Sequence, residues 1–311
     1  MKSSDFSHTA SDGKAIFVRK WLPSGAPKAM LLVAHGMAEH SARYERLASD
    51  LTGAGWAVFA PDHRGHGRTA AEGELGWFAE RDGFARVRDD LHEIALAAVS
   101  EHRGLPLFLL GHSMGSLLAI SYLAAYGREL AGCVLSGILA PLPGPLLLTG
   151  RLIATLGSAF KGRRAPARIL HRMSFDSNNK DFEPARTPND WLSRDGAEVD
   201  KYIADPLCGF VCSFAFYLDF LSGFSSVYGG GAGFSGMPKA MPLFISAGAE
   251  DPLGGSKGFV SLLAERFKAA GLQDIDTRLY PGARHEILNE TNREEVMGDI
   301  KGWLESKLVK A

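Results

Sequence analysis

The chain has 311 residues, of which 46% are hydrophobic and 22% are charged, and its formal net charge is −1. This composition is typical of a globular protein with a large core, and it disfavours disordered and nucleic-acid-binding proteins. The amino-terminal residues contain no apolar signal segment, and no apolar run is long enough to cross a bilayer. We therefore expect a cytoplasmic protein without nucleic-acid partners.

Short apolar runs alternate with helical patterns along most of the chain. This alternation predicts an α/β fold with a mostly parallel, doubly wound sheet that is flanked by helices. Strands are predicted at residues 15–22, 30–34, 57–60, 107–110, 133–135, 243–246 and 277–279, and helices at residues 41–54, 83–102, 114–126, 257–270 and 293–307.

The alternation stops in the middle of the chain, where aromatic and leucine-rich helical patterns appear at residues 146–160 and 210–224. A glycine run at residues 229–233 lacks the strand and the lysine of a phosphate loop, so we interpret it as a linker. The pattern predicts a helical cap inserted over the carboxyl end of the sheet, with an apolar tunnel for an acyl chain. The predicted division is a core of residues 1–140 and 236–311 and a cap of residues 141–235.

The pentapeptide Gly111-His112-Ser113-Met114-Gly115 follows directly after an apolar run. A serine between two glycines at a strand-to-helix turn is held in a strained backbone that presents its hydroxyl at the carboxyl edge of the sheet. The amino terminus of the following helix favours negative charge at the same place. We therefore predict that Ser113 is a nucleophile; the alternative is a tight turn with an incidental serine.

A serine nucleophile needs a histidine base and an orienting carboxylate, which follow it in the chain in the order acid, then base. We predict His285 as the base because it lies between the last strand and the last helix, whereas His171 falls in the cap. Asp251, in the turn after the strand at 243–246, is the predicted acid, and its neighbour Glu250 is the main rival.

An oxyanion intermediate needs backbone N–H donors. We predict that the N–H groups of Met114 and Met37 supply them, because Met114 follows the nucleophile and Met37 follows an earlier strand. Gly36 would let this backbone approach closely.

The three cysteines are sparse and odd in number, which argues against a disulfide framework. Cys208 and Cys212 are four residues apart, a spacing that on a helix places two thiols on one face. Since no histidine is near them in sequence, we interpret Cys133, Cys208 and Cys212 as packed thiols and expect neither a metal nor a cofactor.

The chain resembles α/β-hydrolases of the monoacylglycerol lipase and lysophospholipase family. The resemblance implies cofactor-free hydrolysis of lipid esters that carry one acyl chain, and supporting roles around the oxyanion loop for Asp62, Arg64, His66, Glu39 and Arg43. The chain departs from the usual pattern at Met37-Ala38, where the family has small residues. The segments that carry the resemblance are residues 35–44, 62–68, 111–115, 248–252 and 282–286.

Several alternatives stay open at this stage. A general carboxylesterase would share the same residues, amide hydrolysis would need an acidic amine-binding cap, and a non-enzymatic lipid-binding protein would keep the fold alone. Dehalogenase and epoxide hydrolase chemistry are excluded because they need an aspartate at position 113. The apolar helix at 146–160 suggests transient contact with a membrane surface, with cap packing or a dimer interface as alternatives. The sequence does not fix the oligomeric state.

Overall fold

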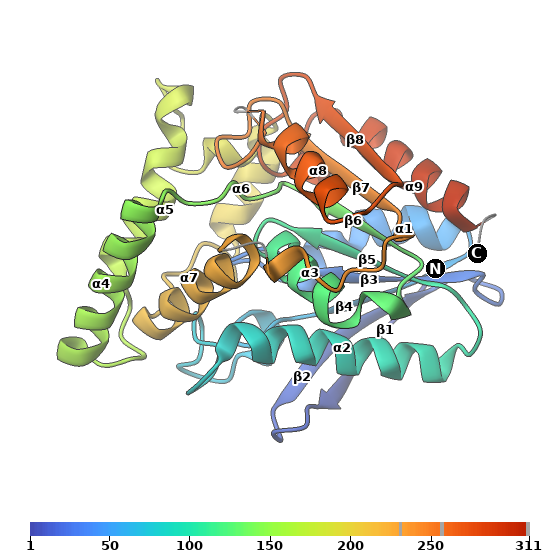
Figure 1. Ribbon diagram of the computed structural model, residues 1–311, viewed down its shortest axis with the longest axis horizontal. Helices are drawn as coiled ribbons and strands as arrows, with labels where there is room; N and C mark the ends of the chain where they lie inside the picture. Colours follow the sequence, from blue (N-terminus) through green and yellow to red (C-terminus); the bar gives the residue numbers. More distant parts are fainter. Residues whose placement is uncertain (230–231, 256–257, 309–311) are drawn as a thin grey trace.

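The computed structural model describes residues 1–229, 232–255 and 258–308, and within these an eight-stranded sheet forms the centre of the molecule (Figure 1). The strands lie in the order β1-β2-β4-β3-β5-β6-β7-β8. β1 and β2 form an antiparallel hairpin, β2 is antiparallel to β4, and the other neighbours are parallel. The strands are β1 (Lys2–Thr9), β2 (Ala15–Leu22), β3 (Ala29–Ala34), β4 (Trp56–Pro61), β5 (Leu107–His112), β6 (Gly132–Ser136), β7 (Leu243–Gly248) and β8 (Ile275–Tyr280).

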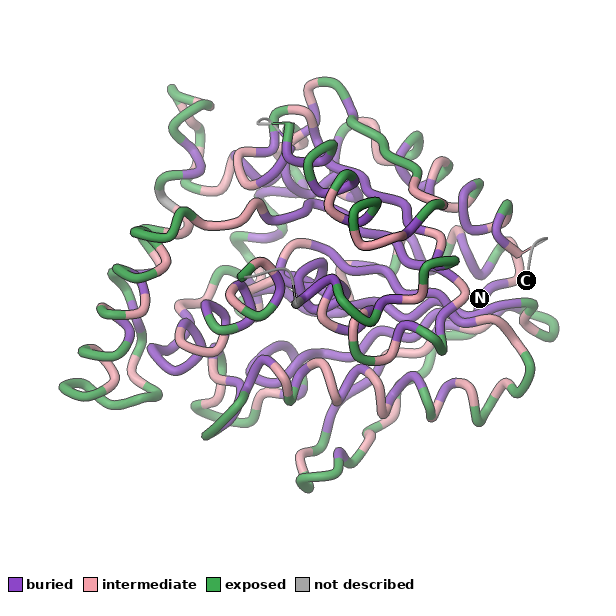
Figure 2. Tube along the Cα trace, in the orientation of Figure 1, coloured by how far each residue is buried: buried purple, intermediate pink, exposed green. Residues whose placement is uncertain are grey.

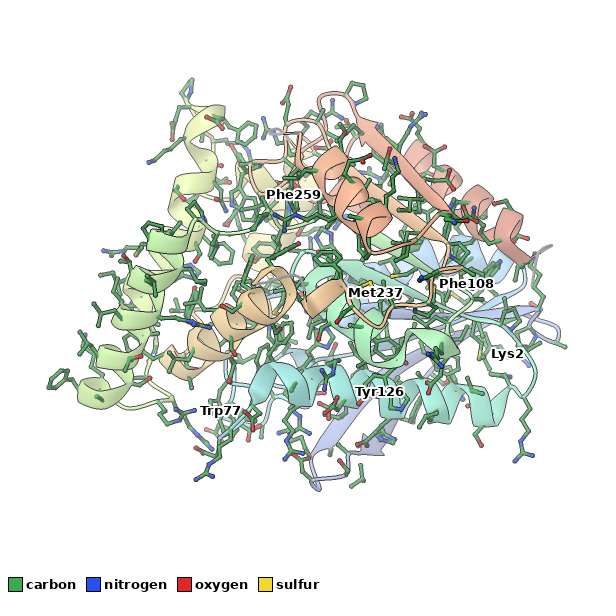
Figure 3. The ribbon with its side chains drawn as sticks, viewed as in Figure 1. Lys2, Trp77, Phe108, Tyr126, Met237 and Phe259 are labelled. Atoms are coloured by element: carbon green, nitrogen blue, oxygen red, sulfur yellow. The ribbon has the colours of Figure 1, made fainter. Side chains whose placement is uncertain are left out.

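Helices cover both faces of this sheet. Successive side chains along a strand point to opposite faces, so each strand contributes to two separate hydrophobic cores. In β3, Met30 and Leu32 pack in the larger core, whereas Leu31 and Val33 pack in the other. Phe108, labelled in Figure 3, is fully buried in the second core. The helices of the larger core are α2 (Gly83–Glu101), α3 (Met114–Tyr126) and α8 (Phe259–Ala269), and those of the second core are α1 (Glu45–Gly53) and α9 (Arg293–Leu308).

Four further helices lie between β6 and β7 in the chain. α7 packs against α2 and α3, whereas α4 and α5 project away from the sheet at the left of Figure 1. Figure 2 shows long exposed stretches along α4 and α5, in contrast to the buried strands. These helices are α4 (Gly144–Lys161), α5 (Arg168–Phe175), α6 (Gly196–Ala204) and α7 (Phe214–Tyr228).

The structure corrects several of the expected boundaries. The second cap helix begins at Phe214 rather than at residue 210, because the Ser213 side chain accepts a hydrogen bond from the Phe216 N–H and caps the helix there. The helix expected from residue 41 opens with a 3₁₀ turn, Ser41–Tyr44, before α1. Cys208 and Cys212 lie in the segment between α6 and α7 rather than on a helix, and they are buried free thiols, as Cys133 is.

Three elements were not expected from the sequence: β1, α5 and α6. β1 is a polar, largely exposed edge strand, so it lacks the apolar alternation that marks a half-buried strand. Residues 230 and 231 of the expected linker and residue 257 of the expected helix lie outside the described residues. The division into core and cap at residues 140/141 and 235/236 stays a prediction. In the part of the chain that the structure describes, no helix has the length and apolarity to span a bilayer.

Candidate active site

Ser113 lies at the sharp turn between β5 and α3, with φ at +53°. This left-handed backbone is costly for a residue with a side chain, by about 1–3 kcal/mol. The flanking glycines allow the tight packing around it. A Cβ on Gly115 would collide with the Ala34 carbonyl oxygen, and one on Gly111 would lie 2.8 Å from the Ala119 methyl group. The turn therefore has the strained geometry expected from the pentapeptide.

His285 and Asp251 form a buried pair. The Nδ1 atom of His285 lies 2.9 Å from Oδ2 of Asp251, which is fully buried at the end of β7. The other Asp251 oxygen, Oδ1, accepts a hydrogen bond from the Leu253 N–H at 2.9 Å. The neighbouring Glu250 is exposed. His171 lies in α5, where its ring stacks on another aromatic ring.

The Asp251 carboxylate controls the protonation of His285. Burial by itself lowers the pKa of His285, but the negative charge of Asp251 and its hydrogen bond outweigh burial and raise that pKa above its ordinary value of 6.5. The structure therefore places a basic imidazole beside a carboxylate that fixes which ring nitrogen carries the proton.

Ser113 and His285 line one cavity of about 530 Å³, together with Gly36, Met37 and Met114. No hydrogen bond joins the Ser113 hydroxyl to the His285 ring in the described part of the chain. Such contacts are often long before substrate binds. The structure thus gathers at one cavity all five residues expected at the active site, four directly on its wall and Asp251 behind His285.

The walls of this cavity are mainly apolar and come largely from the segment between β6 and β7. The polar groups described above line the same cavity, so a bound molecule meets both these groups and a large apolar surface. The apolar wall includes Leu139, Leu142, Leu146, Leu170, Met173, Phe175, Tyr217, Phe220, Leu221, Phe224 and Leu253.

A buried ionic network supports the loop after β3. Oε1 of Glu39 accepts hydrogen bonds from the Gly36 N–H at 2.5 Å and from the Tyr44 hydroxyl at 2.9 Å. The Arg43 guanidinium donates to Oε2 of Glu39 at 2.9 Å and, through two N–H groups, to both oxygens of Glu286 at 2.6 Å. Because Glu286 follows His285, this network joins the two loops that meet at the cavity.

The ion pairs of this network keep Glu39 and Arg43 charged. Burial raises the pKa of Glu39, but the Arg43 guanidinium, with smaller effects of His112 and His35, overcomes it and lowers that pKa to about 2. Burial similarly opposes the charge of Arg43, and the two carboxylates raise its pKa above the ordinary value. Both partners are therefore charged at neutral pH.

The loop at residues 62–68 supports the site only in part as expected. Oδ1 of Asp62 accepts a hydrogen bond from the Ser41 N–H at 2.8 Å, and the His66 ring packs 5.2 Å from that of His35. Burial lowers the pKa of His66 to about 3, so this ring is neutral. Arg64 does not reach the oxyanion loop, because its guanidinium pairs with Asp12 and Asp90.

Three site residues were missed in the sequence: His112, Glu286 and Trp191. The His112 ring lies 5.0 Å from that of His285, and burial lowers the pKa of His112 to about 4. The Trp191 ring also packs on His285, with the ring centroids 5.1 Å apart. Their positions beside Ser113 and His285 could have indicated the first two, but Trp191 comes from the predicted cap, where no local pattern marks it.

The strand order, the strained serine turn and the buried aspartate–histidine pair define an α/β-hydrolase. A family profile described as "Serine aminopeptidase, S33" matches residues 25–292. The chain belongs to this family.

Known relatives match over nearly the whole chain. A monoglyceride lipase from Homo sapiens is 34% identical over 305 residues, which cover 97% of this chain and 90% of that protein. A monoacylglycerol lipase from Mycolicibacterium smegmatis is 28% identical and covers 98% of each chain. The crystal structure of a highly thermostable carboxyl esterase from Bacillus coagulans in complex with glycerol superposes with a TM-score of 0.89, at 28% identity and 99% coverage of each chain. The chain is thus a carboxylic ester hydrolase.

Removing Arg43 tests the ionic network. We expect Arg43→Met to lower the free energy of unfolding by about 3–5 kcal/mol at pH 7, because it leaves buried carboxylates without a cation. The folded-state pKa of Glu39 is depressed, so its contribution is complete above the ordinary value of 4.5 and is lost as the pH falls towards 2. The difference between wild type and variant should therefore shrink below pH 4.5, as measured by urea denaturation.

A matched control is Lys268→Met, which removes an exposed ion pair with Glu265. This variant should change the free energy of unfolding by no more than ~0.5 kcal/mol. Equal effects of the two substitutions would contradict the structural role of Arg43.

Proposed function

We propose that the protein hydrolyses esters that carry a single acyl chain, with monoacylglycerols and lysophospholipids as the substrate class. The observation that carries this proposal is the cavity of about 530 Å³, which is lined mainly by apolar side chains and also by Ser113 and His285. The monoglyceride lipase relatives and the glycerol complex of the similar esterase support the same substrate class.

In the proposed mechanism, His285 takes the proton of the Ser113 hydroxyl as the oxygen attacks the ester carbonyl. Asp251 holds the imidazole and stabilises its protonated form, and the N–H groups of Met37 and Met114 bind the oxyanion. His285 then returns the proton to the departing alcohol. Water, activated by His285, releases the fatty acid and restores Ser113.

The proposed nucleophile is tested by Ser113→Ala with an ester series from acetyl to oleoyl that includes monoacylglycerol. Turnover should fall by roughly four to six orders of magnitude on every ester, because the attacking oxygen is removed. Wild type should prefer medium or long chains. As a control, Ser261→Ala on the exposed face of α8 should keep full activity and fluorophosphonate labelling.

Other outcomes separate the alternatives. Activity restricted to short esters would identify a general carboxylesterase, and preference for aminoacyl amides would identify a peptidase. Absence of both hydrolysis and labelling in wild type would favour a lipid-binding protein, whereas hydrolysis that survives Ser113→Ala would refute the mechanism.

The proposed role of Asp251 predicts a shift in the pH profile. In wild type, kcat/KM should rise with pH as His285 loses its proton, with an apparent pKa above 6.5. In Asp251→Asn the negative charge is lost, so this acidic limb should move to lower pH, while kcat falls roughly 10³–10⁴-fold. Stopped-flow or steady-state assays between pH 5 and 9 measure both effects.

Glu250→Gln is the matched control for this profile, since Glu250 is adjacent in sequence but exposed. It should leave both kcat and the acidic limb unchanged. A loss in Glu250→Gln equal to that in Asp251→Asn would reassign the acid.

We also propose that the outer face of α4 and α5 contacts a lipid surface during the reaction. Leu148, Leu152, Leu156 and Phe160 repeat every four residues along α4, and all are exposed, with Phe160 at 84%. The basic residues Arg168 and Arg172 are exposed on α5, the helix that follows α4 in the chain. Hydrocarbon flanked by cations suits an anionic bilayer surface.

The lipid contact is tested by flotation with vesicles that contain anionic lipid. The double variant Leu152→Ser and Phe160→Ser should lose most of its vesicle binding but should retain hydrolysis of a water-soluble ester. Leu262→Ser, at an exposed leucine of α8, is the control and should bind vesicles like wild type. Self-association of wild type without flotation would instead make this stripe a dimer interface.

A further inference from the structure

We propose that His40, Asp205 and Cys208 form a binding site for a thiophilic divalent cation such as Zn²⁺, separate from the proposed active-site cavity. One potential ligand atom from each of the three side chains lies within 4.8 Å of the others. His40 follows the loop after β3, whereas Asp205 and Cys208 lie between α6 and α7. A cation here would fasten the cap segment to that loop.

The donor chemistry suits zinc. An imidazole nitrogen, a carboxylate oxygen and a thiolate sulfur are its usual ligands, at about 2.0–2.3 Å in a tetrahedral arrangement. Donors around such an ion lie about 3.3–3.8 Å apart. Nε2 of His40 and Oδ2 of Asp205, now 2.9 Å apart, would separate slightly, and the Cys208 thiolate would approach them by up to about 1 Å, within reach of side-chain rotation. The same three residues line a second cavity of about 650 Å³, which offers room for water as a fourth ligand.

The backbone already holds two of the ligands together. Oδ1 of Asp205 accepts a hydrogen bond from the Leu207 N–H at 2.8 Å, and the Cys208 N–H donates to the Asp205 carbonyl at 3.0 Å. Oδ2 of Asp205 lies 2.9 Å from Nε2 of His40. A cation would replace the proton between these two atoms, so the site needs little reorganisation.

The charges around the cluster permit a cation. Burial raises the pKa of the Cys208 thiol, so metal binding would release its proton to solvent. Arg46 and Lys201 line the same cavity, and both pair with Glu198. Arg43 is the positive group that acts on Cys208. Its charge is already matched by Glu39 and Glu286, two carboxylates for one guanidinium, so it does not prevent cation binding.

The site would strengthen an attachment that the structure already contains. The Ala38 carbonyl accepts hydrogen bonds from the Gly209 N–H at 2.9 Å and from the Tyr202 hydroxyl at 3.1 Å. Ala38 itself has a left-handed backbone, with φ at +54°. A cation bound by His40, Asp205 and Cys208 would replace the His40–Asp205 contact across the same junction and add the Cys208 thiolate to it, and we expect it to stabilise the folded protein.

The test uses the full chain freed of metal by chelation and titrated with Zn²⁺ and Co²⁺. Wild type should bind one equivalent of Zn²⁺, raise its melting temperature, and show thiolate-to-cobalt charge-transfer absorption with Co²⁺. Cys208→Ser should lose that absorption and weaken Zn²⁺ binding more than roughly tenfold, and Asp205→Asn should also weaken Zn²⁺ binding. Cys212→Ser removes a neighbouring buried thiol outside the cluster and should behave like wild type.

The melting temperature of each variant without metal shows whether it folds, and Asp205→Asn provides a second route if Cys208→Ser does not. Mg²⁺ should produce no shift, because a hard cation does not prefer thiolate. The proposal is overturned if wild type shows no thiolate–cobalt absorption, or if Zn²⁺ binding is the same in wild type, Cys208→Ser and Asp205→Asn.

Discussion

The geometry of the site depends on one buried cation, the guanidinium of Arg43. It lies between two carboxylates, and each carboxylate belongs to a different functional loop: Glu39 to the loop after β3 and Glu286 to the loop that carries His285. Burial alone would raise the pKa of Glu39, and the Arg43 guanidinium keeps that carboxylate ionised. Ion pairs of Arg43 therefore hold together the two loops that meet at the cavity, whereas most of the cavity lining consists of packed apolar side chains.

Much of the fold could be predicted from local pattern. Buried parallel strands such as β3 and β5 are continuous apolar runs and are easily recognised in a sequence. Gly111 and Gly115 are also informative, because any side chain at these positions would collide with neighbouring atoms. Prediction failed where apolar periodicity is weak. β1 is polar because it lies at an exposed edge. α7 begins at Phe214 because Ser213 caps it there, although residues 210–212 are also apolar and gave no sign of this boundary.

The proposed catalytic residues were found because each lies in a characteristic turn after a strand. The resemblance indicated Arg43 as a supporting residue but not its partner Glu286, since the contacts of such residues join distant parts of the chain. Arg43 and Glu286 are 243 positions apart, and His40 and Asp205 are 165 apart. No local pattern connects such residues. The sequence therefore indicates where chemistry takes place, while the interactions that orient the groups emerge only when the loops meet in three dimensions.

The segment between β6 and β7 is attached to the sheet unevenly. Around α6, backbone hydrogen bonds tie Trp191 and Leu192 to the His285 loop and Gly209 to Ala38. The Tyr202 hydroxyl also donates to the Ala38 carbonyl. α4 and α5, by contrast, present much of their surface to solvent. Under the proposed function, the exposed half of this segment would supply part of the wall that meets the acyl chain, and the anchored half would hold the His285 loop. Substitutions in α4 would change the apolar wall of the cavity without breaking the hydrogen bonds that hold the His285 loop. The preference for acyl-chain length could then change without a change in the reacting groups.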